Sequence, residues 1–250
     1  MLPVFQIGPF ALPVPGISLL LAFWLGLSLA EKRLPLAGPT ADNLYNLVFT
    51  GLVTGLFGAR LGYVFQFPNA FIQSPISFLS LNSGLFDPFT GFVFLLLGMF
   101  IFGQRARLSF FETLDTLTPM LAVLAIGLAI SHIASGESFG SLTNLPWGIY
   151  LWGAKRHPTQ FYELFAASII FILMTLRLVP KFPAGHQFFM FSALTAVSRL
   201  FLETYHGDSP TIMDGLRIKQ IIAWIVLSVA LYSLDKLQRK NFIAKGNDNG

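Results

Sequence analysis

The sequence has no cysteine among its 250 residues, and only 11% of its residues are charged. Without cysteine the chain cannot form structural disulfides, use a thiolate of its own as a nucleophile, or build a metal site that needs cysteine ligands. A soluble domain carries about 25% charged residues, so the low charge, together with 54% hydrophobic residues, excludes an ordinary water-soluble protein. The 16 Lys and Arg residues are scattered in ones and twos, which argues against a nucleic-acid-binding surface.

Long apolar segments recur along the chain, each near the length that a helix needs to cross about 30 Å of hydrocarbon. They cover residues 16–31, 43–66, 89–104, 110–134, 158–179, 187–204 and 216–235. No repeat and no low-complexity tract is found. The sequence therefore predicts an all-α, polytopic membrane bundle of about seven transmembrane helices, organised as one membrane-embedded domain over residues 1–250.

The basic residues near the ends of these segments predict the orientation, because cytoplasmic loops carry the excess of Lys and Arg. One set of loops carries ten: Lys32, Arg33, Arg105, Arg107, Arg177, Lys181, Lys236, Arg239, Lys240 and Lys245. The opposite set carries four: Lys155, Arg156, Arg217 and Lys219. The N-terminus is thus predicted outside. Residues 1–15 lack the positive start of a signal peptide, and residues 1–16 are expected to lie along the outer surface.

Two loops on the predicted outer side are long, at about residues 67–88 and 135–157. The first is almost free of charge and rich in Phe and Ser. Two interpretations are open for such loops: contact with lipid or another membrane protein, and a plug that covers the bundle.

Charged residues inside the apolar segments are functional candidates, because each costs about 2.5–3.5 kcal/mol near the bilayer centre on insertion scales. The candidates are Arg60, Glu112, Asp115, His132, Glu137, His157, Glu163, Arg199 and Glu203. Two arginines converging from different helices would bind a phosphate, since a guanidinium binds anions in a bidentate manner. We therefore predict that Arg60 and Arg199 form an anion site.

Each of these candidates also has a purely structural interpretation. Arg60 follows the small residues Gly51, Gly55, Gly58 and Ala59, which would let helices approach closely, and it could be a packing residue. Arg199 and Glu203 are four apart and could form an intrahelical ion pair. Glu112 and Asp115 lie near the basic residues at 105 and 107, which favours a solvated salt-bridge cluster.

The most informative stretch is residues 156–163, Arg-His-Pro-Thr-Gln-Phe-Tyr-Glu, at the start of the fifth apolar segment. Its Pro suits a first helical turn, so one interpretation is a capped helix start with an aromatic residue at the membrane interface. An imidazole beside a carboxylate and two cations is also what proton transfer near neutral pH requires.

Several motifs together resemble the prolipoprotein diacylglyceryl transferase family. Residues 157–163 resemble the signature His-Pro-Ser/Thr-Gln-Leu-Tyr-Glu, with Phe161 in place of Leu. Further matching segments are residues 4–10, residues 58–64 around Arg60, residues 145–148 (Leu-Pro-Trp-Gly) and residues 198–203 (Ser-Arg-Leu-Phe-Leu-Glu). The resemblance covers nearly the whole chain, and the family's seven-span topology with the N-terminus outside agrees with the distribution of basic residues.

The chain departs from the family at three places. The signature Gly-Arg-x-Gly-Asn-Phe-x-Asn-Gly-Glu corresponds to residues 128–137, where only Gly136 and Glu137 match. Phe89-Thr90-Gly91 stands where the family has His-Gly-Gly, and Val14-Pro15 stands where it has Trp-Tyr. The chain could be a divergent enzyme, a relative with another substrate or an inactive paralogue.

The resemblance implies transfer of a diacylglyceryl group from phosphatidylglycerol to the lipobox cysteine of a bacterial prolipoprotein, without a metal or cofactor. The expected partners are phosphatidylglycerol, the prolipoprotein signal peptide and membrane lipid, but no nucleic acid. The enzyme would cross the bacterial plasma (inner) membrane, with its active site toward the outer face. The expected catalytic residues are His157, His132 and Arg199, and the expected substrate-binding residues are Arg60, Glu137, Gln160, Tyr162, Glu163 and Glu203.

The choice of base is open at this stage. His132 lies three positions after Ala129, which corresponds to the family's missing Arg, and so shares roughly one helix face with it. A packing or pore-lining role for His132 is the alternative. His206 is expected in a solvated loop. Two other functions stay open: a non-catalytic protein that binds phosphatidylglycerol or signal peptides, and an anion transporter, which the absence of internal symmetry disfavours.

Overall fold

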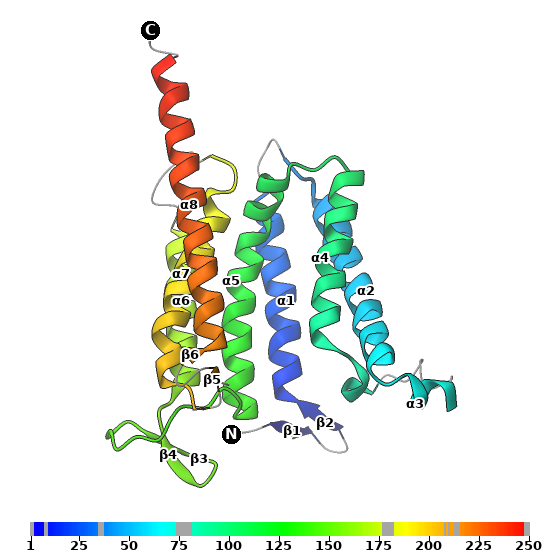
Figure 1. The fold of residues 1–250 in the computed structure, drawn as a ribbon, viewed down its shortest axis with the longest axis vertical. Helices are drawn as coiled ribbons and strands as arrows, with labels where there is room; N and C mark the ends of the chain where they lie inside the picture. Colours follow the sequence, from blue (N-terminus) through cyan, green and yellow to red (C-terminus); the bar gives the residue numbers. More distant parts are fainter. Residues whose placement is uncertain are drawn as a thin grey trace. The chain divides into compact units, whose positions relative to one another are not determined.

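The structure, a computed structural model, describes residues 3–7, 10–34, 38–73, 82–176, 183–207, 209, 211–212 and 216–247 (Figure 1). Most of these residues are helical. The chain divides into two compact units. The first unit is made of Met1–Arg33 together with Leu114–Gly250, and the second is Leu34–Thr113. The single domain expected from the sequence stays a prediction. Several expectations fall outside the described residues: those for Arg177, for Lys181 and for residues 74–81 of the first long loop.

The first unit consists of helices with short hairpins at one end (Figure 1). Its helices are α1 (Val14–Lys32), most of α5 (Phe110–Ser135), α6 (Thr159–Thr175), α7 (His186–Leu202), η3 (Glu203–Tyr205) and α8 (Ile218–Asn247). Its antiparallel hairpins pair β1 (Val4–Ile7) with β2 (Phe10–Pro13), β3 (Ile149–Leu151) with β4 (Ala154–Arg156), and β5 (Thr211–Ile212) with β6 (Leu216–Arg217). The hairpins are additions to the all-α fold that the sequence predicts.

Close helix contacts hold this unit together. α1 and α5 approach at a glycine on each helix: a Cβ on Gly26 would lie 3.0 Å from the carbonyl oxygen of Met120, and a Cβ on Gly127 would overlap Ala22. α7 begins where the Asp115 carboxylate of α5 accepts the backbone N–H groups of Gly185 at 2.7 Å and Phe188 at 2.9 Å. Asp115 thus caps a helix start, which favours a carboxylate, instead of belonging only to a solvated salt-bridge cluster.

The second unit is built around two helices in intimate contact. It contains α2 (Ala41–Gln66), α3 (Pro68–Gln73), η2 (Ser83–Leu85) and α4 (Pro88–Arg105). Small residues face the partner helix along the whole seam: a Cβ on Gly55 would lie 3.0 Å from Leu95 Cβ, and one on Gly62 would lie 2.5 Å from Thr90 Cβ. The expectation that the glycines of the second apolar segment permit close helix approach is therefore confirmed.

The start of α4 is capped by a carboxylate outside the apolar helix. Asp87 accepts the backbone N–H of Thr90 at 2.8 Å. The hydrogen bonds from the Thr90 side chain and backbone lower the pKa of the Asp87 carboxyl below its ordinary value.

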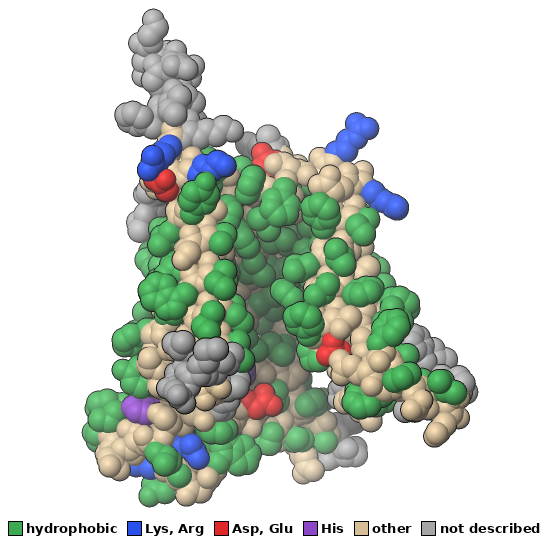
Figure 2. Space-filling model, viewed as in Figure 1, with side chains coloured by type: hydrophobic (Ala, Val, Ile, Leu, Met, Phe, Trp, Pro, Cys, Tyr) green, Lys and Arg blue, Asp and Glu red, His purple; other side chains and the backbone are tan. Residues whose placement is uncertain are grey.

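Within the described residues, five helices are long and apolar enough to cross a membrane: Val14–Lys32, Ala41–Gln66, Pro88–Arg105, Phe110–Ser135 and Ile218–Arg239. α6 is a shorter apolar helix. Large hydrophobic side chains lie exposed along these helices, Trp24, Phe65 and Trp224 among them, and Figure 2 shows hydrophobic side chains over the helix surfaces. Apolar surface on this scale needs lipid rather than water around it, so the chain is a multi-pass membrane protein.

Candidate functional site

A cluster of ionisable side chains surrounds Glu163 on α6 in the first unit. Glu163 Oε2 lies 2.8 Å from His132 Nδ1 of α5, and Oε1 accepts hydrogen bonds from Ser138 Oγ at 3.1 Å and from Arg199 Nη1 of α7. The Glu163 side chain is only 10% exposed. A carboxylate removed from water in this way needs several donors. The three helices therefore meet at one charged centre.

His206, which follows η3, is the fourth partner of Glu163. It is fully buried; its Nε2 lies 3.1 Å from Glu163 Oε1 and 2.9 Å from Ser138 Oγ, and its Nδ1 lies 3.0 Å from the carbonyl oxygen of Leu202. Nδ1–H donates to that carbonyl. With His206 neutral, the one proton of the Ser138 hydroxyl goes either to His206 Nε2 or to Glu163 Oε1; with His206 protonated, Nε2–H donates to Glu163 and Ser138 keeps its own bond to the carboxylate. The solvated position expected for His206 is wrong.

Backbone pairing between two loops puts His206 in place. The N–H of Ser141 donates to Tyr205 O at 2.7 Å, and the N–H of Gly207 donates to Phe139 O at 2.9 Å. A Cβ on Gly207 would lie 2.7 Å from the carbonyl oxygen of Gly140, so only glycine permits this approach. From β6, Arg217 donates to the carbonyl oxygens of Glu203 and His206 and fixes the turn.

The motif at residues 157–163 fixes the loop that precedes it. Thr159 and Gln160 are fully buried. Thr159 Oγ1 donates to Ser138 O at 2.7 Å, and Gln160 Nε2 donates to Glu137 O at 2.9 Å. The first turn of α6 thus holds this loop, and Glu163 organises the charged centre. Pro158 at the helix start makes no side-chain cap, and the role of the motif in proton transfer stays a prediction.

The carboxylate partner of Arg199 differs from the expected one. Glu203 was the possible intrahelical partner, but in the described part of the chain Arg199 pairs with Glu163. Glu203 is fully buried and accepts from Ser209, and the Glu137 side chain is exposed. Glu203 keeps helical backbone angles, and its N–H donates to the carbonyl oxygen of Arg199. Its carboxylate is bound by Ser209 and lies 3.8 Å from His206 Nδ1 instead of reaching Arg199.

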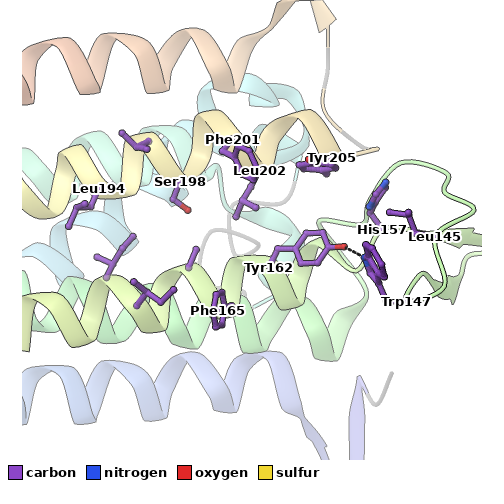
Figure 3. Close-up of a pocket in the computed structure, with 14 residues that line it drawn as sticks. Leu145, Trp147, His157, Tyr162, Phe165, Leu194, Ser198, Phe201, Leu202 and Tyr205 are labelled. Carbon is purple, nitrogen blue, oxygen red and sulfur yellow. Dashed lines mark hydrogen bonds between the residues drawn. The ribbon is translucent and has the colours of Figure 1, made fainter.

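An apolar groove of about 650 Å³ lies between α6 and α7, beside this cluster (Figure 3). Its walls include Phe165, Leu194, Val197 and Phe201. The end nearest the hairpin of β3 and β4 is lined by His157, Tyr162, Tyr205, Leu145 and Trp147. Trp147 Nε1 donates to the Tyr162 hydroxyl at 2.9 Å (Figure 3). The His157 ring centroid lies 5.1 Å from that of Tyr205, with the rings tilted by 56°. The His157 Nδ1 is buried without a hydrogen-bond partner in the described part of the chain.

Arg199 borders two smaller cavities on the other side. One, of about 130 Å³, also contains Glu163 and Ala129. The other, of about 410 Å³, lies between α7 and α8 and also contains Lys219 and Thr195. Ala129 and His132 thus both face the Glu163 centre, as their spacing predicted. The guanidinium has cavities on its free side where an anion could bind.

Arg60 belongs to the second unit, where it is buried. Its Nη1 donates to the carbonyl oxygen of Leu85 at 2.8 Å, and its guanidinium lies over the rings of Phe71 at 5.5 Å and Phe86 at 5.2 Å. These contacts agree with a packing role. The convergence of Arg60 with Arg199 stays a prediction.

Sequence reasoning gave no role to Ser138, because nothing around it suggested one. Ser138 has φ +54°, a conformation that residues with a Cβ rarely adopt. We expect the Ser138→Gly variant to be roughly 1 kcal/mol more stable than Ser138→Ala. Both variants lose the hydroxyl, but only glycine lacks the Cβ that makes a positive φ unfavourable. Thermal unfolding in detergent measures the difference. Equal melting temperatures would show that the backbone here is not strained.

The fold and the site together define a multi-pass helical membrane protein with a buried arginine–carboxylate–histidine centre next to an apolar groove. Residues 3–234 match the sequence pattern of the family described as prolipoprotein diacylglyceryl transferase. The chain belongs to that family.

Curated relatives carry the corresponding enzyme name, phosphatidylglycerol–prolipoprotein diacylglyceryl transferase. The chain is 30% identical over 209 residues to the protein of Aliivibrio salmonicida, a match covering 81% of this chain and 70% of the relative. It is 28% identical over 227 residues to that of Clostridioides difficile, covering 90% and 91%. It is 28% identical over 208 residues to that of Photobacterium profundum, covering 80% and 74%.

Proposed function

We propose that this protein transfers the diacylglyceryl group of phosphatidylglycerol to the lipobox cysteine of a bacterial prolipoprotein. The cysteine thiol loses its proton, a carbon–sulfur bond forms to the glyceryl carbon, the bond from that carbon to the phosphate oxygen breaks, and glycerol 1-phosphate leaves. The observation that carries the proposal is the Glu163 centre, in which an arginine and two histidines converge on one buried carboxylate beside an apolar groove. The names of the relatives support the same reaction.

The proposed topology has seven crossings, with the N-terminus outside and the C-terminus in the cytoplasm of a bacterium whose inner membrane holds the enzyme. α6 and α7 supply the two crossings beyond the five long apolar helices. The end of α5 and the start of α6, which hold the charged centre, then face outward, where few basic residues lie. The active site is proposed at this outer end.

Arg199 is proposed to bind the departing phosphate. One of its nitrogens is bound to Glu163, and its side chain is 35% exposed toward the cavities that it borders. Lys219 lines the same cavity between α7 and α8, so two cations are available to one phosphate. Positive charge placed where negative charge develops in the transition state is the largest source of catalysis in such sites. Phosphate binding by Arg60 stays a separate prediction, because the contacts of Arg60 within the second unit agree with a packing role.

His132 is proposed as the base that takes the thiol proton. The unperturbed pKa of a thiol is about 8.5, so an acceptor is needed near neutral pH. The bond from His132 Nδ1–H to Glu163 leaves Nε2 unprotonated, which is the orientation that a carboxylate–histidine pair gives to a base. His157, on the groove wall, is the second candidate.

The groove between α6 and α7 is proposed to receive an apolar segment of a substrate, an acyl chain or the signal peptide, entering sideways from the bilayer. Phenylalanine and leucine side chains are among those that line it, as an apolar segment entering from the bilayer requires. Tyr162 lines the groove and is proposed to contact the lipid head group or the peptide backbone. Gln160 is fully buried and holds the preceding loop through Glu137 O.

Complementation tests the function. The chain is expressed in cells depleted of their own transferase, and a reporter lipoprotein is examined for thioether-linked diacylglycerol. We expect modified reporter with the wild-type chain, a loss of about 100-fold or more with Arg199→Ala, and a larger loss with His132→Asn than with His157→Asn. Full activity of Arg199→Ala would reject the phosphate site.

A second candidate function is a catalytically impaired paralogue that binds phospholipid or signal peptide. The observation that favours it is the loss of the family's signature residues between 128 and 137. In the same experiment, a chain that inserts correctly, binds phosphatidylglycerol and leaves the reporter unmodified would establish this alternative.

A further inference from the structure

The hairpin formed by β3 and β4 presents a group of exposed aromatic side chains. Trp147 is 58% exposed, Tyr150 83% and Trp152 65%. We name these three residues the aromatic tip. We propose that the aromatic tip inserts into the boundary between the head groups and acyl chains of an anionic lipid surface, and so sets the depth of the groove mouth in the membrane. This inference requires that the chain spans a membrane and is independent of whether it transfers a diacylglyceryl group.

The turn of the hairpin places tryptophan where the backbone disfavours it. Trp152 has φ +54° and Gly153 has φ +76°, the pair of left-handed conformations for which Asn-Gly is the preferred sequence. A bulky residue with positive φ is an outlier. Since most of the Trp152 ring is exposed, packing within the chain does not account for it, and strain of this kind points to a role in binding.

Both tryptophans are held in fixed orientations with their rings outward. Trp152 Nε1 donates to Gly136 O at 3.0 Å, and Trp147 Nε1 donates to the Tyr162 hydroxyl at 2.9 Å. The polar edge of each indole is thereby satisfied by the protein while the apolar ring stays exposed. Tryptophan and tyrosine with this division of polar and apolar edges concentrate at membrane interfaces.

The position of the hairpin and its charge indicate that the aromatic tip contacts lipid. Trp147 lines the groove between α6 and α7, at the end nearest the hairpin (Figure 3). Lys155 lies opposite Tyr150 in the hairpin. The segment between Glu137 and Glu163 contains Lys and Arg but no Asp or Glu, so it complements anionic head groups.

The first arm of the test measures where the Trp152 ring lies. Trp152 is made the sole tryptophan by Trp24→Phe, Trp147→Phe and Trp224→Phe, and the protein is placed in vesicles of phosphatidylcholine with phosphatidylglycerol. We expect lipids brominated near the glycerol end of the acyl chain to quench the fluorescence by about twofold, and aqueous iodide to quench it weakly. A matched protein with Trp224 alone, on α8, reports the depth of a helix residue.

Two results would overturn the proposal. One is full quenching by iodide with no effect of brominated lipid. The other is protection from iodide that develops only when a lipobox peptide is added, which would assign the surface to a peptide. The same measurement is made in vesicles of phosphatidylcholine alone. If brominated lipid quenches Trp152 as strongly there as in the anionic vesicles, the aromatic tip does not require an anionic head group.

The second arm separates binding from folding with Trp152→Asn. Asparagine tolerates the positive φ of this turn position, so we expect the melting temperature in detergent to stay unchanged or to rise. In two proteins whose sole tryptophan is Trp147, one carrying Trp152→Phe and the other Trp152→Asn, brominated lipid should quench Trp147 less in the Asn variant. A marked fall in the melting temperature would instead make Trp152 a structural residue and contradict the proposal.

Discussion

Glu163→Gln is expected to lower diacylglyceryl transfer by about 100- to 5,000-fold, because removing one partner of a buried charge pair costs about 3–5 kcal/mol. Glutamine keeps the shape of the side chain but removes the negative charge shared by Arg199, His132 and His206. The guanidinium would lose its orienting partner, and His132 would lose the acceptor that fixes its ring. Transfer to a lipobox peptide by purified protein measures the effect.

A matched control breaks a carboxylate–arginine pair on the surface. Asp235 and Arg239 of α8 lie 2.8 Å apart, and both side chains are largely exposed. An exposed pair of this kind contributes about 0.3–0.5 kcal/mol, so Asp235→Asn should leave transfer within about twofold. Comparable losses in the two variants, at equal amounts of folded protein, would contradict the role given to the Glu163 centre.

Gly58→Ala is expected to destabilise the second unit by about 1–3 kcal/mol, the cost of overpacking a tight contact. The added Cβ would overlap the Cβ and ring of Phe94 on α4, and Phe94 Cβ cannot rotate away because it is fixed to the backbone. α2 and α4 must therefore separate along their seam. A fall in melting temperature by roughly 2–4 °C per kcal/mol should be seen in detergent.

Gly103→Ala is the control for this substitution. Gly103 lies on α4 as well, but a Cβ there would meet nothing within 4 Å. Alanine has the higher helix propensity by about 1 kcal/mol, so the melting temperature should stay or rise. If Gly58→Ala behaves like Gly103→Ala, the close seam does not exist in the protein.

Some features could be predicted because they depend on local spacing. Glycines separated by three or four positions share a helix face, so the contact side of α2 followed from Gly51, Gly55 and Gly58. The same geometry placed His132 and Ala129 on one side, and both face the Glu163 centre. The Pro after His157 predicted the start of α6 to within a residue.

Other features could not be predicted because they depend on contacts between distant segments. The partner of Arg199 is 36 positions away, whereas the nearby Glu203 lies just past the helix end. His206 is buried by pairing with residues around Gly140, and no local pattern carries that information. The hairpins escaped prediction because a strand of two to four residues has no periodicity to detect.

The amino-acid sequence alone determined that the protein lies in a membrane, since a chain so apolar and so poor in charge is stable only where lipid covers its helices. It also determined the family and the residue types available for chemistry, which are properties of composition and motif. Only the tertiary structure decided which charged groups share a centre. The reason is that a buried carboxylate accepts whichever donors the folded helices bring within about 3 Å, whatever their separation along the chain.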